Sequence, residues 1–144
     1  MKFNIKRFFT DNKFKKLTIM SYIYSAIFRF QIKFIKPKKL KKHWGKEGVE
    51  SDTEESREHY LFAAHVSQTV NRICNKTSWE SKCLVRALTA QRMLVKQGIP
   101  STMYLGVRED NGKMLAHAWL RVGKMIVTGG EVCDGFTVVD KFCK

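Results

Sequence analysis

The sequence predicts an α+β fold in which helices come first and a small antiparallel sheet follows. Apolar residues recur at intervals of three and four as far as residue 97, which is typical of amphipathic helices. After Pro100 they alternate with polar residues, which is typical of half-buried strands. Glycines in the second half of the chain divide it into short segments, as hairpins between neighbouring strands require.

The charge of this 144-residue chain divides it into two parts. Residues 1–50 hold 14 of the 27 basic residues but three of the 13 acidic ones, and the remainder is nearly balanced. We therefore expect a basic, partly helical N-terminal arm over residues 1–46 and a separate domain over residues 50–144. The uneven charge indicates an anionic partner for the arm, or else a solvated lysine face.

The arm contains a candidate helix over residues 14–35, where lysines are mixed with Ile, Phe and Tyr. Its uncharged run, residues 17–28, is shorter than the roughly 20 residues that span a bilayer. The pattern predicts a cationic helix that either packs on the rest of the protein or lies on a membrane surface. No secretory signal is visible, so we expect a cytoplasmic protein, with peripheral contact to the inner membrane surface if the arm binds lipid.

Two further helices are expected before the sheet. The first begins at Ser51, which together with Glu54 fits a capping box, and it ends near Cys74. The second begins after an N-cap at Ser81 and runs to about residue 97, where a glycine and a proline end it.

The strands follow as runs of alternating residues bounded by turn signals, over residues 101–108, 116–122, 125–128 and 136–139. The Gly-Lys pair at 123 and 124 is typical of a two-residue hairpin turn, so Val122 should oppose Met125. Counting back along both strands then places His117 opposite Gly130.

Cys83 is the candidate nucleophile. It lies in the first turn of a predicted helix, where backbone N–H groups are unpaired and the helix dipole is positive. Both features favour the nucleophilic thiolate, and the same N–H groups can hold the oxyanion of a tetrahedral intermediate. The competing interpretation is a small buried hydrophobe, as for Cys74, Cys133 and Cys143. No C-x-x-C pair occurs, and we expect neither a metal site nor a cofactor.

His117 is the candidate base, at the start of a predicted strand. A cysteine at a helix start, followed by a histidine on a sheet, is the chain order of papain-like and transglutaminase-like sites, so we expect a core of that kind. There the imidazole accepts the thiol proton and later donates it to the leaving amine. The competing interpretation is a core histidine that is hydrogen-bonded on a sheet face.

Several separate blocks of this sequence resemble the lasso-peptide leader peptidases. They cover residues 79–88, 94–100, 104–108, 116–120 and 129–131, the last followed by Phe136. The resemblance extends over about residues 50–142 and is dense from 78 to 131. The basic N-terminal region resembles the short members of the family, in which the leader-binding domain is a separate protein.

The resemblance implies a cysteine endopeptidase that removes the leader from a ribosomally made precursor, at the bond before the core peptide. By position, Cys83 is then the nucleophile and His117 the general base, while Trp79 and Trp119 line the substrate pocket or pack in the core. The implied partners are the precursor peptide, a leader-binding protein acting in trans, and the cyclase that uses the freed core amine.

The sequence departs from the family pattern at two positions. Longer relatives often carry an aspartate some way after the histidine, and none occurs in residues 126–131. Glu131 is the nearest acid and is expected to orient His117, with Asp134 or a simple Cys–His dyad as alternatives. A glutamate often seen two residues after the tryptophan is Arg121 here.

Other functions stay open at this stage. A transglutaminase-like acyltransferase would use the same Cys83 and His117 and differ only in the acyl acceptor. A catalytically inactive scaffold in a peptide-maturation complex would need neither side chain. A nucleic-acid binder would explain the charge, but no RRM, KH or zinc signature accompanies it, and we do not expect nucleic acid as a partner.

Overall fold

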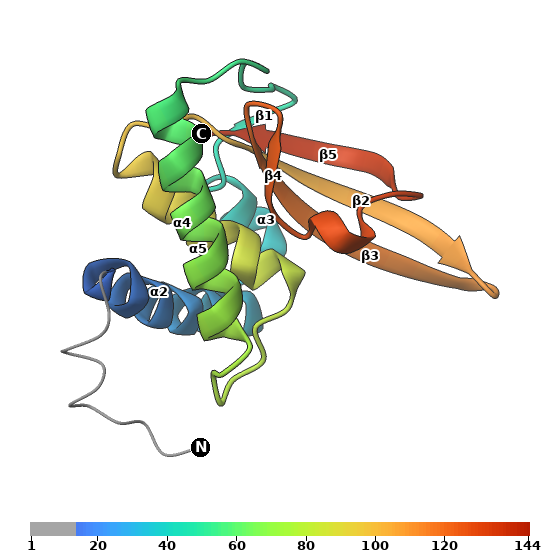
Figure 1. The fold of residues 1–144 in the computed structure, drawn as a ribbon. Helices are drawn as coiled ribbons and strands as arrows, with labels where there is room; N and C mark the ends of the chain where they lie inside the picture. The colour runs from blue at the N-terminus through green and yellow to red at the C-terminus, as the bar shows by residue number, and fades with distance from the viewer. Residues whose placement is uncertain (1–13) are drawn as a thin grey trace.

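The computed structural model describes residues 14–144 as helices followed by a five-stranded antiparallel sheet, which confirms the predicted α+β class. The helices are α2 (Lys15–Phe34), α3 (Pro37–Lys41), α4 (Arg57–Cys74), α5 (Cys83–Val95) and the short 3-10 helix η1 (Gly130–Val132). The strands are β1 (Lys46–Glu47), β2 (Thr102–Asp110), β3 (Lys113–Val122), β4 (Met125–Thr128) and β5 (Thr137–Cys143). Figure 1 shows α2, α4 and α5 on one side of the molecule and the sheet on the other.

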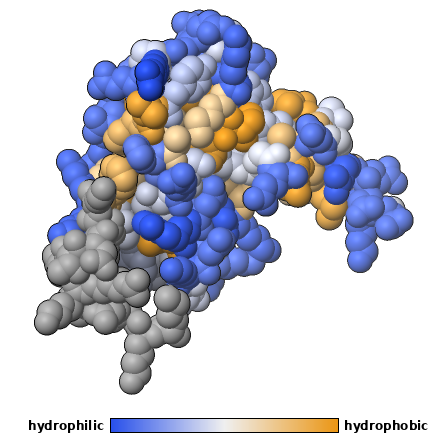
Figure 2. Space-filling model, in the orientation of Figure 1, coloured by the Kyte–Doolittle hydropathy of each residue, from blue (hydrophilic) through white to orange (hydrophobic). Residues whose placement is uncertain are grey.

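The sheet has the order β1-β5-β2-β3-β4, so the long hairpin of β2 and β3 lies near its centre. This hairpin turns at Asn111 and Gly112, both with positive φ, as a tight two-residue hairpin turn requires. The hairpin extends well beyond the helices (Figure 1). Figure 2 shows hydrophobic residues on this hairpin and the neighbouring sheet among hydrophilic ones. The large exposed apolar side chains of the sheet include Met114 and Val139.

Helix α2 packs against α4 and α5, and α3 follows it. Leu17, Leu40 and Trp44 from this part of the chain belong to the same buried cluster as residues of α4, α5 and the sheet. No helix in residues 14–144 is long and apolar enough to cross a bilayer. The division at residues 46–50 stays a prediction, and the first 13 residues of the predicted arm lie outside the described residues.

Helix α4 begins later than predicted, because a tertiary contact uses the groups of the expected capping box. Ser51 is buried, and both its backbone N–H and its hydroxyl bond to the Thr102 hydroxyl at 2.8 Å. The helix instead begins after Ser56, whose side chain accepts a hydrogen bond from the backbone N–H of His59 at 3.2 Å. The N-cap predicted at Ser51 is therefore wrong.

The hairpin of β3 and β4 has the predicted turn but a different register further along. Val122 opposes Met125 as predicted, but an irregularity between Leu120 and Arg121 shifts the pairing, and β4 ends at Thr128 opposite Leu120. The chain thus leaves the sheet before it reaches His117. The predicted pairing of His117 with Gly130 is wrong. Counting residues from the turn assumes a regular ladder, and the irregularity in β3 shifts the register.

The two faces of β3 have different surroundings. Ala118 and Leu120 belong to the buried cluster that the sheet shares with α4 and α5. His117, Trp119 and Arg121 alternate with them, so they point to the opposite face. The candidate base therefore lies on the face turned away from the helices.

Candidate active site

Cys83 is the first residue of α5, with the extended Lys82 as N-cap. Ser81, the predicted N-cap, instead places its hydroxyl 2.9 Å from that of Thr77, so that prediction is wrong by one residue. No side chain caps this end of α5 by a hydrogen bond. The half-buried Cys83 packs against the buried cluster, beside backbone N–H groups of the kind that hold an oxyanion.

The imidazole of His117 is held by a backbone carbonyl. Its Nε2 lies 2.8 Å from the carbonyl oxygen of Gly129. Its ring stacks on Trp119, with centroids 5.9 Å apart, and contacts Phe136 at 5.3 Å. Because a carbonyl only accepts hydrogen bonds, Nε2 carries the hydrogen, and Nδ1 of the neutral ring is left as the basic nitrogen.

Gly129 makes this approach possible because it has no side chain. Its φ is +76°, a conformation that favours glycine. A Cβ at this position would lie 2.6 Å from the carbonyl oxygen of Ala118 and 3.0 Å from His117 Nε2. The close contact between the loop after β4 and the imidazole therefore depends on a glycine at position 129.

No hydrogen bond joins Glu131 to His117 in the structure. Glu131 lies in η1 with an exposed side chain, and within residues 14–144 its carboxylate forms no hydrogen bond or ion pair. Asp134, the second choice, is also exposed. An orienting role for Glu131 stays a prediction, with the carbonyl of Gly129 as the competing group.

Cys83 and His117 lie on elements that pack together, α5 and β3, but they are not in contact through a hydrogen bond. Cys83 packs against the buried cluster, whereas His117 lies on the sheet face turned away from it. Because β4 ends opposite Leu120, the described sheet leaves this edge of β3 unpaired at His117. The two side chains therefore lie toward different faces of β3, and the strand edge at His117 is open.

Trp119 is a packing residue of the outer sheet face. It is 7% exposed, and its ring stacks on Tyr104 with centroids 5.5 Å apart. Gly106 makes room for it, because a Cβ there would lie 2.8 Å from the Trp119 ring. Of the two roles left open for this tryptophan, its geometry fits packing.

Trp79 lies elsewhere, on the loop before α5. Its Nε1 donates to the Ser25 hydroxyl at 3.3 Å, and its ring packs edge-on to Tyr22 at 4.8 Å. It lines a surface pocket of about 360 Å³ with Glu80 and residues of α2. Trp79 thus lines a pocket beside the loop that leads to Cys83, whereas Trp119 packs on the outer face of the sheet.

The sequence matches the model of a known protein family. The model is that of the transglutaminase-like superfamily, and it matches residues 35–141. The chain belongs to the transglutaminase-like superfamily. Comparisons with curated proteins and with solved structures found no match. The matched residues include Cys83, His117 and Glu131, and the superfamily suggests a cysteine peptidase or an acyltransferase.

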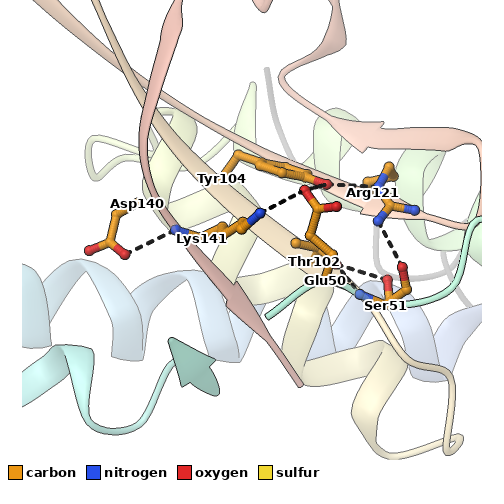
Figure 3. Close-up of polar contacts among 7 residues, drawn as sticks. All are labelled: Glu50, Ser51, Thr102, Tyr104, Arg121, Asp140 and Lys141. Atoms are coloured by element: carbon orange, nitrogen blue, oxygen red, sulfur yellow. Dashed lines mark hydrogen bonds and ion pairs between the residues drawn. The ribbon is translucent and has the colours of Figure 1, made fainter. Parts of the chain in front are cut away.

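Arg121, which departs from the leader-peptidase pattern, ties the segment before α4 to this transglutaminase-like core (Figure 3). Its Nε donates to the Tyr104 hydroxyl at 3.0 Å and its Nη2 to the Ser51 carbonyl at 2.9 Å. Its Nη1 donates to the carbonyls of Asp52 and Gly123. A glutamate could donate none of these bonds, so the arginine here has a structural reason.

Arg121→Lys is expected to lower the free energy of unfolding by about 1–3 kcal/mol, because a lysine cannot reproduce the planar fork of donors. Thermal unfolding followed by circular dichroism measures the change. Arg57→Lys, at an exposed position at the start of α4, is the matched control and should melt with the wild type. Equal melting temperatures for both variants would show that the Arg121 bonds contribute nothing to stability.

The Tyr104 hydroxyl also donates to Glu50 at 2.9 Å (Figure 3). This hydrogen bond, helped by Lys141 and Arg121, lowers the pKa of the Glu50 carboxyl in the folded protein. A lowered folded-state pKa contributes stability that is present above the unfolded-state pKa and is lost as the pH falls through the folded-state value.

Tyr104→Phe should therefore make the stability less dependent on pH in the acid range, below roughly pH 4.3, the usual glutamate pKa. The measurement is the unfolding midpoint in urea for wild type and variant at neutral and at acid pH. Because Glu50 is exposed, the difference between the two pH profiles should be small. Parallel profiles would contradict the assignment of the lowered pKa to Tyr104.

Proposed function

We propose that the protein is a cysteine endopeptidase that removes the leader peptide from a lasso-peptide precursor. Membership of the transglutaminase-like superfamily supports cysteine-dependent acyl chemistry. The observation that carries the proposal is the hydrogen bond from His117 Nε2 to the Gly129 carbonyl, which leaves Nδ1 to accept a thiol proton. The resemblance in sequence narrows the substrate to a leader peptide.

In the proposed reaction, the Cys83 thiol gives its proton to His117 Nδ1, and the sulfur attacks the carbonyl carbon of the last leader residue. The N–H groups at the start of α5 stabilise the resulting oxyanion. His117 then donates the proton to the leaving amine of the core peptide, and a thioester joins the leader to Cys83. Water, deprotonated by His117, hydrolyses the thioester and regenerates the thiol.

This reaction requires Cys83 and His117 to meet around the open edge of β3. Catalytic hydrogen bonds are often long or absent without substrate and form in the complex. The loop after β4 carries the Gly129 carbonyl, so its position sets where the imidazole lies. We infer that binding of the precursor brings the start of α5 and this loop together.

The remaining partners of the proposed reaction are separate proteins. We propose that a leader-binding protein presents the precursor in trans and that the freed core amine passes to a cyclase. Cleavage should then be at least about tenfold faster with the leader-binding protein, since it raises the local concentration of the scissile bond. Mass spectrometry of the leader fragment measures the rate, and equal rates with and without the partner would refute the split arrangement.

Cleavage in ¹⁸O-labelled water separates the peptidase from an acyltransferase. A peptidase places one ¹⁸O atom in the new carboxyl group of the leader, because water is the acyl acceptor. An acyltransferase leaves that carbonyl joined to an added amine. The proposal is wrong if the enzyme, the precursor and the leader-binding protein together give the amine adduct, or if they give no leader fragment.

A further inference from the structure

Helix α2 turns small polar residues toward the protein. Ser21 and Ser25 are fully buried, and their hydroxyls donate to the carbonyls of Leu17 at 2.8 Å and Tyr22 at 2.9 Å. These bonds satisfy the hydroxyls inside the helix, so both serines can face α4 and α5 at little cost. Because small residues occupy the inner side of α2, several of its large apolar residues lie on the side that faces away from the protein.

That outer side is an apolar strip. Its members recur at intervals of three and four, which places them on one face of the helix. They are between 42% and 63% exposed, and they are Ile19, Tyr22, Ile23, Ile27, Phe30 and Phe34. Single exposed apolar residues are ordinary, but a contiguous row of this size marks an interaction surface. We call these six residues the α2 strip.

The surroundings of the α2 strip are basic. No Asp or Glu occurs between residues 12 and 46. Exposed lysines lie on α2 and around α3 at positions 16, 33, 36, 38, 39 and 42. Lys33 lines the pocket of about 360 Å³ together with the strip residues Phe30 and Phe34, and in the same pocket Arg29 is paired with Glu80 at 2.9 Å, so among the described residues these lysines supply the unpaired charge. The strip thus combines apolar and aromatic side chains with cations at its rim.

The combination of apolar and basic side chains indicates what binds to the α2 strip. A second copy of the chain would pair by two-fold symmetry and would set these lysines against each other. An anionic bilayer offers an acyl boundary for the apolar side chains and phosphates for the lysines, each lysine contributing a favourable attraction. We propose that α2 docks the protein on the surface of an anionic membrane, with the strip in the headgroup region and the lysines on lipid phosphates.

Vesicle co-sedimentation of the full chain tests this proposal. Binding to vesicles of phosphatidylcholine with phosphatidylglycerol is expected at low salt, with weaker binding at high salt and little to phosphatidylcholine alone. Soluble glycerol phosphate should not compete, because it lacks the acyl boundary. Absence of binding to the anionic vesicles at low salt, or equal binding to both kinds of vesicle, would overturn the proposal.

Matched variants locate the surface. Phe30→Ala with Phe34→Ala should lower the partition coefficient at least tenfold, whereas Met114→Ala with Val139→Ala, at similarly exposed apolar positions on the sheet, should not. Lys33→Gln with Lys36→Gln should lower it about fivefold per lysine, and Lys76→Gln with Lys113→Gln should have less effect. Every changed residue is exposed, so unchanged melting curves verify folding.

The same variants test whether another occupant covers the α2 strip. Analytical ultracentrifugation that finds a dimer converted to a monomer by the Phe30 and Phe34 changes would assign the strip to a second copy. Wild-type lipid binding by those variants would likewise overturn the proposal. Because none of these measurements uses peptide cleavage, their outcome is independent of the proposed peptidase.

Discussion

Replacement of Cys83 by alanine is expected to abolish cleavage of the precursor and to leave the fold intact. Without the sulfur no thioester forms, and loss of a covalent nucleophile lowers kcat by at least about a thousandfold. Alanine is a strong helix former and suits the first position of α5, so far-UV circular dichroism should hardly change. The rate of appearance of the leader fragment, followed by mass spectrometry, is the measurement.

Cys143→Ala is the matched control, because Cys143 is a half-buried free cysteine on β5, outside α5 and outside the loop after β4. This variant should cleave at the wild-type rate. A thiol probe adds a second readout, in which Cys83 should react fastest. Cys74 should react slowly, because burial raises the pKa of its thiol. Full activity in Cys83→Ala would refute Cys83 as the nucleophile and with it the proposed peptidase, whereas absence of cleavage by the wild type in the mixture with precursor and leader-binding protein would favour the inactive scaffold.

The elements that the sequence predicts well are those fixed by nearby residues. Alternation of apolar residues locates β2, β3 and β4, and the turn at residues 123 and 124 forms where expected. The position of Cys83 at a helix start also follows from local signals. These patterns act over a few residues, so no knowledge of the tertiary structure is needed to interpret them.

The errors occur where distant residues decide. Ser51 does not cap a helix because it bonds to Thr102, which comes from another part of the chain. The prediction also misses β1 and ends β5 too early, since both depend on pairing with strands that are distant in the sequence. Partners of this kind leave no mark in the local sequence.

The site shows the same limit. The group bonded to His117 is a backbone carbonyl, which every residue has, so no side-chain pattern identifies it. Its sign in the sequence is the pair of glycines after β4, where the chain must approach a side chain closely. The bonds of Arg121 cannot be predicted from nearby residues either, because two of its acceptors, Ser51 and Asp52, come from a distant segment.

Gly129→Ala is expected to lower kcat by at least about a hundredfold, because a displacement of about 1 Å in a catalytic group has effects of that size. The added Cβ would lie 2.6 Å from the Ala118 carbonyl and 3.0 Å from His117 Nε2, so the loop and the imidazole must separate. The pH dependence of kcat should also change, because the hydrogen bond on Nε2 is weakened.

Gly112→Ala separates this effect from backbone strain. Gly112 has the same φ of +76°, but nothing lies within 4 Å of its added Cβ. Both alanine variants therefore share the strain of the left-handed conformation, about 1–2 kcal/mol, and should lose similar stability from it. Only Gly129→Ala should lose activity.

Glu131→Gln tests the competing orienting group. A drop in kcat well beyond that of Asp134→Asn would assign the orienting role to Glu131. Wild-type activity in Gly129→Ala would exclude the Gly129 carbonyl from that role.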